Sequence, residues 1–106
     1  MNLADRIVAH VGGHCGSHFY IIAGEGWQAK LSASDFERDW RVAGALMEKC
    51  ETVTVNSNFN GEKFERGMFN VLACAGEKHI GFGRANSTNE PHAIIEACVE
   101  ALETDK

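Results

Sequence analysis

Three histidines and one cysteine lie close together near the start of the chain, at His10, His14, Cys15 and His18. Imidazole and thiolate groups are ligands that zinc prefers, and a Cys–His pair is the minimum for thiol catalysis. Intervening glycines interrupt the continuous helix on which the histidines would share a face, and no second ligand pair or orienting carboxylate completes a site. The sequence therefore predicts a loop with solvated histidines, no metal and no cofactor. A small metal-binding or thiol-dependent enzyme using these four residues is the alternative.

A second group of polar residues runs from Gly81 to Asn89 and into the helix expected after it. The N-terminus of a helix presents free N–H groups and a partial positive charge, so neighbouring cationic and hydroxyl side chains there suit a phosphate or carboxylate. The spacing matches neither a phosphate loop nor a dinucleotide fingerprint. The alternative is an ordinary capped helix start in a polar loop. The residues expected to bind a small anionic ligand are Arg84, Asn86, Ser87, Thr88 and His92.

Two aromatic residues, Phe59 and Phe64, lie in an otherwise polar stretch from Ser57 to Gly67. Aromatic side chains are enriched at the centres of binding surfaces, so this pair is a candidate for binding a partner protein. The alternative is that both rings fold back and close an edge of the core.

Hydrophobic spacing and capping residues predict the elements that position these groups. Ser34 and Glu37 form a capping box before a buried stripe of apolar residues at helical spacing, which consists of Phe36, Trp40, Ala43, Met47 and Cys50. Asn2 and Asn89 are the expected N-caps of the first and last helices. The expected helices are 3–11, 34–50 and 89–103, and the expected strands are 18–22, 27–31, 52–56, 68–75 and 79–82.

This order of elements predicts one α+β domain over residues 1–106. An antiparallel sheet of about three to five strands would pack against two long amphipathic helices and a short N-terminal helix. No repeat, linker or low-complexity segment suggests a second domain.

Composition narrows the class of protein. Apolar residues make up 44% and charged residues 24%, which is typical of a soluble globular chain. Ten basic and fifteen acidic residues give a net charge of −5, which argues against general binding to a nucleic-acid backbone. No secretory signal or membrane-spanning run is recognisable, so we expect a cytoplasmic protein with reduced, mostly buried cysteines.

Two helical segments carry a family resemblance: Asp39 to Cys50, DWRVAGALMEKC, and Pro91 to Leu102, PHAIIEACVEAL. With the strands between them they resemble small proteins encoded by phages and prophages of enteric bacteria, the phage ABA sandwich family. The resemblance covers roughly the last two thirds of the chain and supplies no catalytic residue. It implies a phage accessory protein that resides in the host cytoplasm and acts on host machinery or host defences by binding.

The expected function is therefore non-catalytic. The protein would block a host protein or sequester a small anionic molecule such as a signalling nucleotide. A structural, homo-oligomeric assembly protein is a further alternative, and because small domains with exposed sheet edges often dimerise, a homo-oligomer is expected under each hypothesis.

Overall fold

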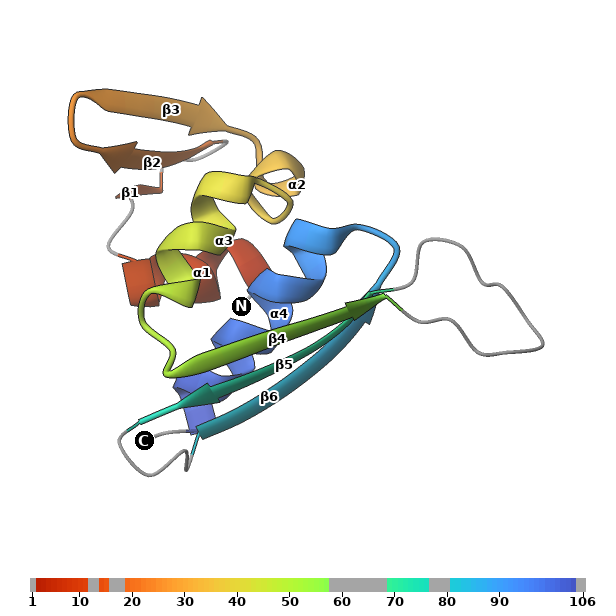
Figure 1. Cartoon of the computed structure of the whole chain (residues 1–106). Coiled ribbons are helices and arrows are strands. Elements are labelled where there is room, and N and C mark those ends of the chain that lie inside the picture. The colour runs from red at the N-terminus through yellow and green to blue at the C-terminus, as the bar shows by residue number, and fades with distance from the viewer. Residues whose placement is uncertain (1, 12–13, 16–18, 58–68, 77–80, 105–106) are drawn as a thin grey trace.

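The computed structural model describes residues 2–11, 14–15, 19–57, 69–76 and 81–104 (Figure 1). Its helices and strands belong to the expected α+β class, with a short N-terminal helix and a long C-terminal one. In chain order they are α1 (Leu3–Val11), β1 (His14–Cys15), β2 (Tyr20–Gly24), β3 (Trp27–Leu31), α2 (Ala33–Phe36), α3 (Trp40–Met47), β4 (Thr52–Ser57), β5 (Phe69–Ala75), β6 (Gly81–Ser87) and α4 (Glu90–Thr104). None of the helices in these residues is long and apolar enough to cross a membrane.

The strands form two separate antiparallel sheets, in the orders β1-β2-β3 and β4-β5-β6. In the first sheet, the expected hairpin forms between β2 and β3, where Gly26 adopts a positive φ of 79° in the turn. Tyr20 attaches this hairpin to the helices, since its ring stacks on Phe36 with centroids 5.1 Å apart and its hydroxyl donates to Asp5 at 2.9 Å. The second sheet is the larger one, and it is the sheet on which the core is built.

Helix α4 covers one face of the β4-β5-β6 sheet and packs most closely against β6 (Figure 1). Small residues make this close approach possible. A Cβ added at Gly83 would lie 1.9 Å from the carbonyl oxygen of Ala97 and 2.7 Å from the backbone nitrogen of Ala101. The glycine therefore sets the distance between helix and sheet, because no side chain fits between their backbones.

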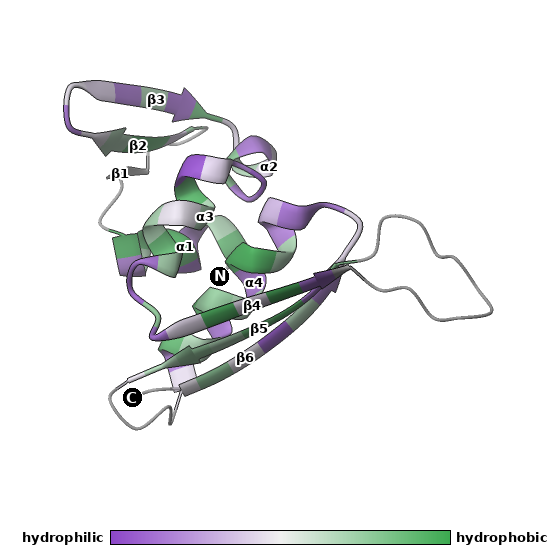
Figure 2. Ribbon diagram, viewed as in Figure 1, coloured by the Kyte–Doolittle hydropathy of each residue, from purple (hydrophilic) through white to green (hydrophobic). Residues whose placement is uncertain are grey.

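The core lies between this sheet and the helices α1, α3 and α4, where the apolar residues gather (Figure 2). Its largest fully buried side chains are Phe36, Ile7, Leu46, Ile94, Ile95, Val42, Val71, Val99 and Cys98. Every second residue of β5 and of β6 faces this core, as expected for strands with one covered face.

The prediction of a single helix over residues 34–50 is wrong, because an interruption between Glu37 and Asp39 divides this segment into α2 and α3. The break changes which residues face the core. Trp40 and Met47 were expected on the buried stripe, but they are 58% and 37% exposed. Val42 and Leu46 are buried instead, whereas Phe36 and Ala43 are buried as the expected stripe requires.

The expected capping box of Ser34 and Glu37 is also wrong. Ser32 is the N-cap of α2, and its hydroxyl accepts the Asp35 N–H at 3.2 Å. Asp39, in an extended conformation, begins α3 by accepting the Arg41 N–H at 2.8 Å. Glu37 acts on another helix, where its carboxylate accepts the Ala4 N–H at 3.1 Å. A free N–H in the first turn of α1 therefore has a partner from a distant segment.

The two expected asparagine caps are confirmed. Asn2 accepts the Asp5 N–H at 2.8 Å at the start of α1, and Asn89 accepts the His92 N–H at 2.9 Å at the start of α4. The segment between β5 and α4 differs from the expectation. A strand ending at residue 82 and then a loop were predicted, but β6 continues to Ser87 and pairs with β5 along its whole length.

Candidate functional site

The face of the β4-β5-β6 sheet that points away from α4 is not covered by another described element, as Figure 1 shows. We call this surface the outer face. Strand register aligns its residues in three rows that run across the sheet. The rows are Thr52, Cys74 and Phe82; Thr54, Leu72 and Arg84; and Asn56, Asn70 and Asn86.

A hollow of about 350 Å³ lies on the outer face at the last two of these rows. We call it the Arg84 hollow. Its lining residues are Asn56, Asn70, Val71, Leu72, Arg84 and Asn86. One asparagine from each strand contributes an amide, and each amide can both donate and accept hydrogen bonds. The hollow therefore combines one cationic group with a row of neutral polar groups.

Within the part of the chain that the structure describes, Arg84 forms no ion pair, unlike Arg6 with Glu103 and Arg41 with Asp39. The Arg84 side chain is exposed, since neighbouring Gly83 and Ala85 take the covered side of β6. Phe82 lies one row away on the same strand and is 45% exposed. The outer face thus presents an arginine available to an anion, and beside it an aromatic ring in contact with solvent.

The structure separates the five residues that the sequence grouped as ligand-binding. Arg84 and Asn86 lie together in the Arg84 hollow. The Ser87 hydroxyl accepts the Asn89 N–H at 3.1 Å, so it stabilises the turn before α4, and Thr88 is exposed in that turn. His92 lines a different hollow. Only two of the five side chains are therefore brought to one place, because alternation along β6 turns Arg84 and Asn86 to the outer face and the strand ends at Ser87.

His92 joins α4 to the end of α2. Its Nδ1 lies 2.9 Å from the carbonyl oxygen of Glu37, and its Nε2 contacts the Glu96 carboxylate. The hollow around it has a volume of about 420 Å³ and is lined by Leu3, Arg6, Glu37, His92, Glu96 and Glu100. Three glutamates make this surface unsuitable for an anion. The contacts of His92 instead stabilise the packing of the helices.

Asn56, Asn70 and Leu72 were not singled out from the sequence. A row across a sheet depends on strand register, and register brings residues 56, 70 and 86 together across two connections. The sequence shows three asparagines at these positions, but it does not show that they align in one row. A predicted strand that reached Ser87 would have placed Asn86 in the sheet, where it can align with asparagines of the neighbouring strands.

The structure describes the backbone of most of the histidine cluster, but among its side chains only that of His10. His10 is on α1, His14 and Cys15 form β1, and residue 18 is outside the described ranges. No group of three or more potential metal ligands occurs among the side chains that the structure describes. Phe59 and Phe64 also lie outside those ranges. Metal binding at the cluster and partner binding by the two rings remain predictions.

Cys50, Cys74 and Cys98 are free thiols, as expected from the sequence, but only Cys98 of these three is buried, and Cys50 and Cys74 are partly exposed. Cys50 and Cys98 are neighbours although 48 positions separate them. A hydrogen bond from the Cys98 thiol lowers the pKa of Cys50, while the same contact and burial raise the pKa of Cys98. Cys50 lies between α3 and β4 and packs against the core that contains Cys98 of α4, so the pair does not belong to the outer face.

Comparison of the chain with models of known protein families, with curated proteins and with solved structures finds no match. The resemblance to the phage ABA sandwich family therefore remains an expectation from the sequence.

Proposed function

We propose that this chain is a non-catalytic binding protein whose Arg84 hollow takes a small anionic ligand, with a nucleotide as the leading candidate. We further propose that it is a phage or prophage accessory protein that sequesters such a molecule in conflict with the host. The binding part of the proposal is supported by the geometry of the outer face. The biological setting is supported by the family resemblance of residues 39–50 and 91–102.

The observation that carries the proposal is the position of Arg84. Its side chain is exposed, has no acidic partner among the described residues, and lies beside a row of three asparagine amides. A guanidinium group binds phosphate or carboxylate through two parallel hydrogen bonds. Amide side chains recognise the donor and acceptor edges of a planar polar ring. Successive residues on one face of a strand are about 7 Å apart, which is comparable to the distance between the base and the phosphate of a nucleotide.

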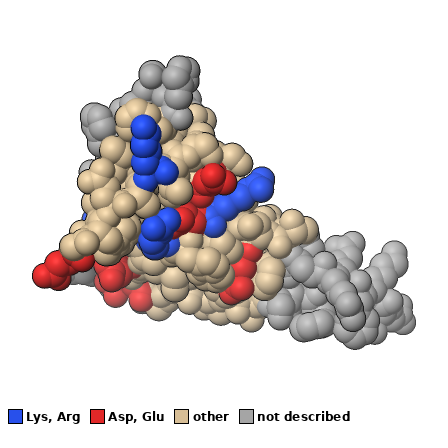
Figure 3. All heavy atoms as spheres, turned by 90° about the horizontal axis from the view of Figure 1, so that it is seen from above, with Lys and Arg blue, Asp and Glu red and all other residues tan. Residues whose placement is uncertain are grey.

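The size and charge of the site favour a small molecule over a nucleic acid. A hollow of about 350 Å³ is near the lower end of the range for small-molecule sites. The chain carries a net charge of −5, and basic and acidic side chains are interspersed on the face seen in Figure 3. A nucleic-acid backbone requires a clustered positive surface, whereas one phosphate requires only one well-placed arginine.

Isothermal titration calorimetry with inorganic phosphate, mononucleotides, cyclic nucleotides and dicarboxylates tests the proposal. We expect at least one of these compounds to bind and Arg84→Ala to weaken that binding by about tenfold or more, equivalent to about 1.4 kcal/mol. Arg41→Ala is the matched control, because it removes the same charge from an exposed arginine outside the hollow. A panel without any binder, or equal affinity of the wild type and Arg84→Ala, would contradict the proposal.

The biological setting needs a separate experiment. A host that carries a nucleotide-signalling defence would express the chain and then be infected with a sensitive phage. We expect the wild-type chain to raise the number of plaques and Arg84→Ala to have no such effect. Equal plaque numbers with and without the wild-type chain would contradict the anti-defence role while leaving the measured ligand binding intact.

A host protein is the second candidate for the outer face, because Phe82 is 45% exposed there and Leu72 is half-buried in the next row. Exposed aromatic residues are common anchors of protein interfaces. Phe82→Ser would then abolish binding of the host protein in native mass spectrometry, whereas binding of a small anion at Arg84 would persist. The metal or thiol enzyme remains the alternative outside this face, and zinc that is lost on His14→Ala would support it.

A further inference from the structure

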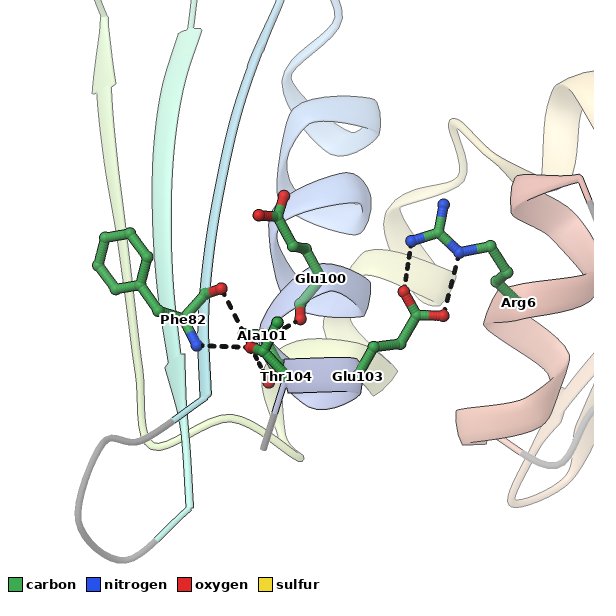
Figure 4. A network of polar contacts seen from close by, with 6 residues as sticks. All are labelled: Arg6, Phe82, Glu100, Ala101, Glu103 and Thr104. Carbon is green, nitrogen blue, oxygen red and sulfur yellow. Dashed lines mark hydrogen bonds and ion pairs between the residues drawn. The ribbon is translucent and has the colours of Figure 1, made fainter. Parts of the chain in front are cut away.

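The two edges of the β4-β5-β6 sheet differ in how their backbone groups are satisfied. At the β6 edge, the Thr104 hydroxyl accepts the Phe82 N–H at 2.9 Å and lies 3.2 Å from the Phe82 carbonyl oxygen (Figure 4). The same hydroxyl is within hydrogen-bonding distance of the Glu100 and Ala101 carbonyls of α4. The end of α4 therefore blocks the pairing of another strand with β6 at Phe82.

At the β4 edge, no described strand or helix takes this position, since β5 is the only strand that pairs with β4. The six residues of β4, TVTVNS, pair with β5 in an unbroken register, so the edge has no bulge. They include no proline and no charged residue. Bulges, prolines and charges are the usual means by which proteins prevent pairing at a sheet edge, and β4 has none of them.

The inner side of β4 is also incompletely covered. Helix α4 lies mainly against β6 and β5 and makes few contacts with β4. Val53 and Val55 point to the inner side and are only partly buried, whereas Val71 on β5 is 1% exposed. A further strand beside β4 would place apolar groups next to both valines and remove them from water.

We propose that β4 pairs in antiparallel fashion with β4 of a second copy of this chain, which joins two three-stranded sheets into one of six strands. A two-fold axis at Thr54 would place Thr54 opposite its copy and bring Val53 of one copy beside Val55 of the other on the inner side. Each chain has a net charge of −5, and the uncharged β4 edge is a place where two such chains meet without like-charge contacts between strands. This proposal is independent of ligand binding at the Arg84 hollow.

Sedimentation velocity and hydrogen exchange of the full chain test this proposal together. We expect the mass to rise with concentration from 11.6 kDa toward twice that value. We also expect the amides of β4 to exchange more slowly at high concentration, while amides of β6 exchange at the same rate throughout. The exchange measurement uses the wild-type chain, so it does not depend on any variant folding.

Thr54→Lys adds a charge at the middle of the β4 edge, on an exposed side chain whose replacement leaves the core intact. Two lysines opposed across the axis should weaken dimerisation by about tenfold or more. Phe82→Lys is the matched control on the opposite edge strand, and we expect it to leave dimerisation unchanged. A monomer at all concentrations would overturn the proposal. A dimer that Thr54→Lys leaves unchanged or that Phe82→Lys disrupts would overturn it as well.

Discussion

Replacing Gly83 by alanine tests the close contact between β6 and α4 on which the sheet and the core depend. Ordinary van der Waals contact begins at 3.4 Å, and the new Cβ would lie 1.9 Å from the Ala97 carbonyl oxygen. The helix would therefore have to withdraw by about 1.5 Å, because main-chain atoms cannot turn aside as a flexible side chain can. Ala93, Ala97 and Ala101 are all fully buried, so the displacement would open voids along the helix.

We expect Gly83→Ala to lower the free energy of unfolding by about 3 kcal/mol, at the upper end of the usual cost of overpacking. Urea denaturation followed by circular dichroism measures this as a lower midpoint with an unchanged slope. Gly44→Ala is the matched control, since a Cβ at this helical glycine meets nothing within 4 Å. It should raise the free energy of unfolding by up to about 1 kcal/mol.

A second variant identifies the cause of the loss. If main-chain atoms of α4 are the obstacle, shortening the side chain in Gly83→Ala/Ala97→Gly will not restore stability. A Gly83→Ala midpoint equal to that of the wild type would refute the reasoning, as would full rescue by Ala97→Gly.

Two further predictions concern ionisable groups. The Arg41 guanidinium and the α3 N-terminus lower the pKa of Asp39 in the folded chain. The ionised carboxylate therefore stabilises the fold at pH values above the pKa of the unfolded chain. This stabilisation is lost as the pH falls through the lower pKa of the folded chain. Asp39→Asn removes the charge but keeps a good helix cap. We therefore expect the difference in free energy of unfolding between wild type and variant to be largest near neutral pH and to shrink below about pH 4. Denaturation measured over a series of pH values checks this. The hydrogen bond from Cys98 lowers the pKa of Cys50, so iodoacetamide should modify Cys50 before buried Cys98, and Cys98→Ala should slow modification of Cys50 at neutral pH. Faster labelling of Cys98, or a Cys50 rate unchanged by Cys98→Ala, would contradict the assigned contact.

The sequence alone determined the class of the fold and most of its elements. Helical spacing behind Asn2 and Asn89 identified α1 and α4, and the glycines around residue 25 identified the β2–β3 hairpin. These signals are local, since caps, turns and periodicity depend on residues a few positions apart. The same local information misplaced the helix over 34–50, where Asp39 begins a new helix and changes which side chains are buried.

Only the tertiary structure decided how distant residues combine. The polar stretch around Arg84 was recognisable, but alternation along β6 turns Arg84 and Asn86 to the outer face while His92 joins α2 to α4. The asparagine row depends on the pairing of three strands, and the capping of Phe82 at the β6 edge depends on the position of Thr104. Strand register and the packing of a helix on a sheet arise from contacts between residues far apart in the sequence, which local patterns do not encode.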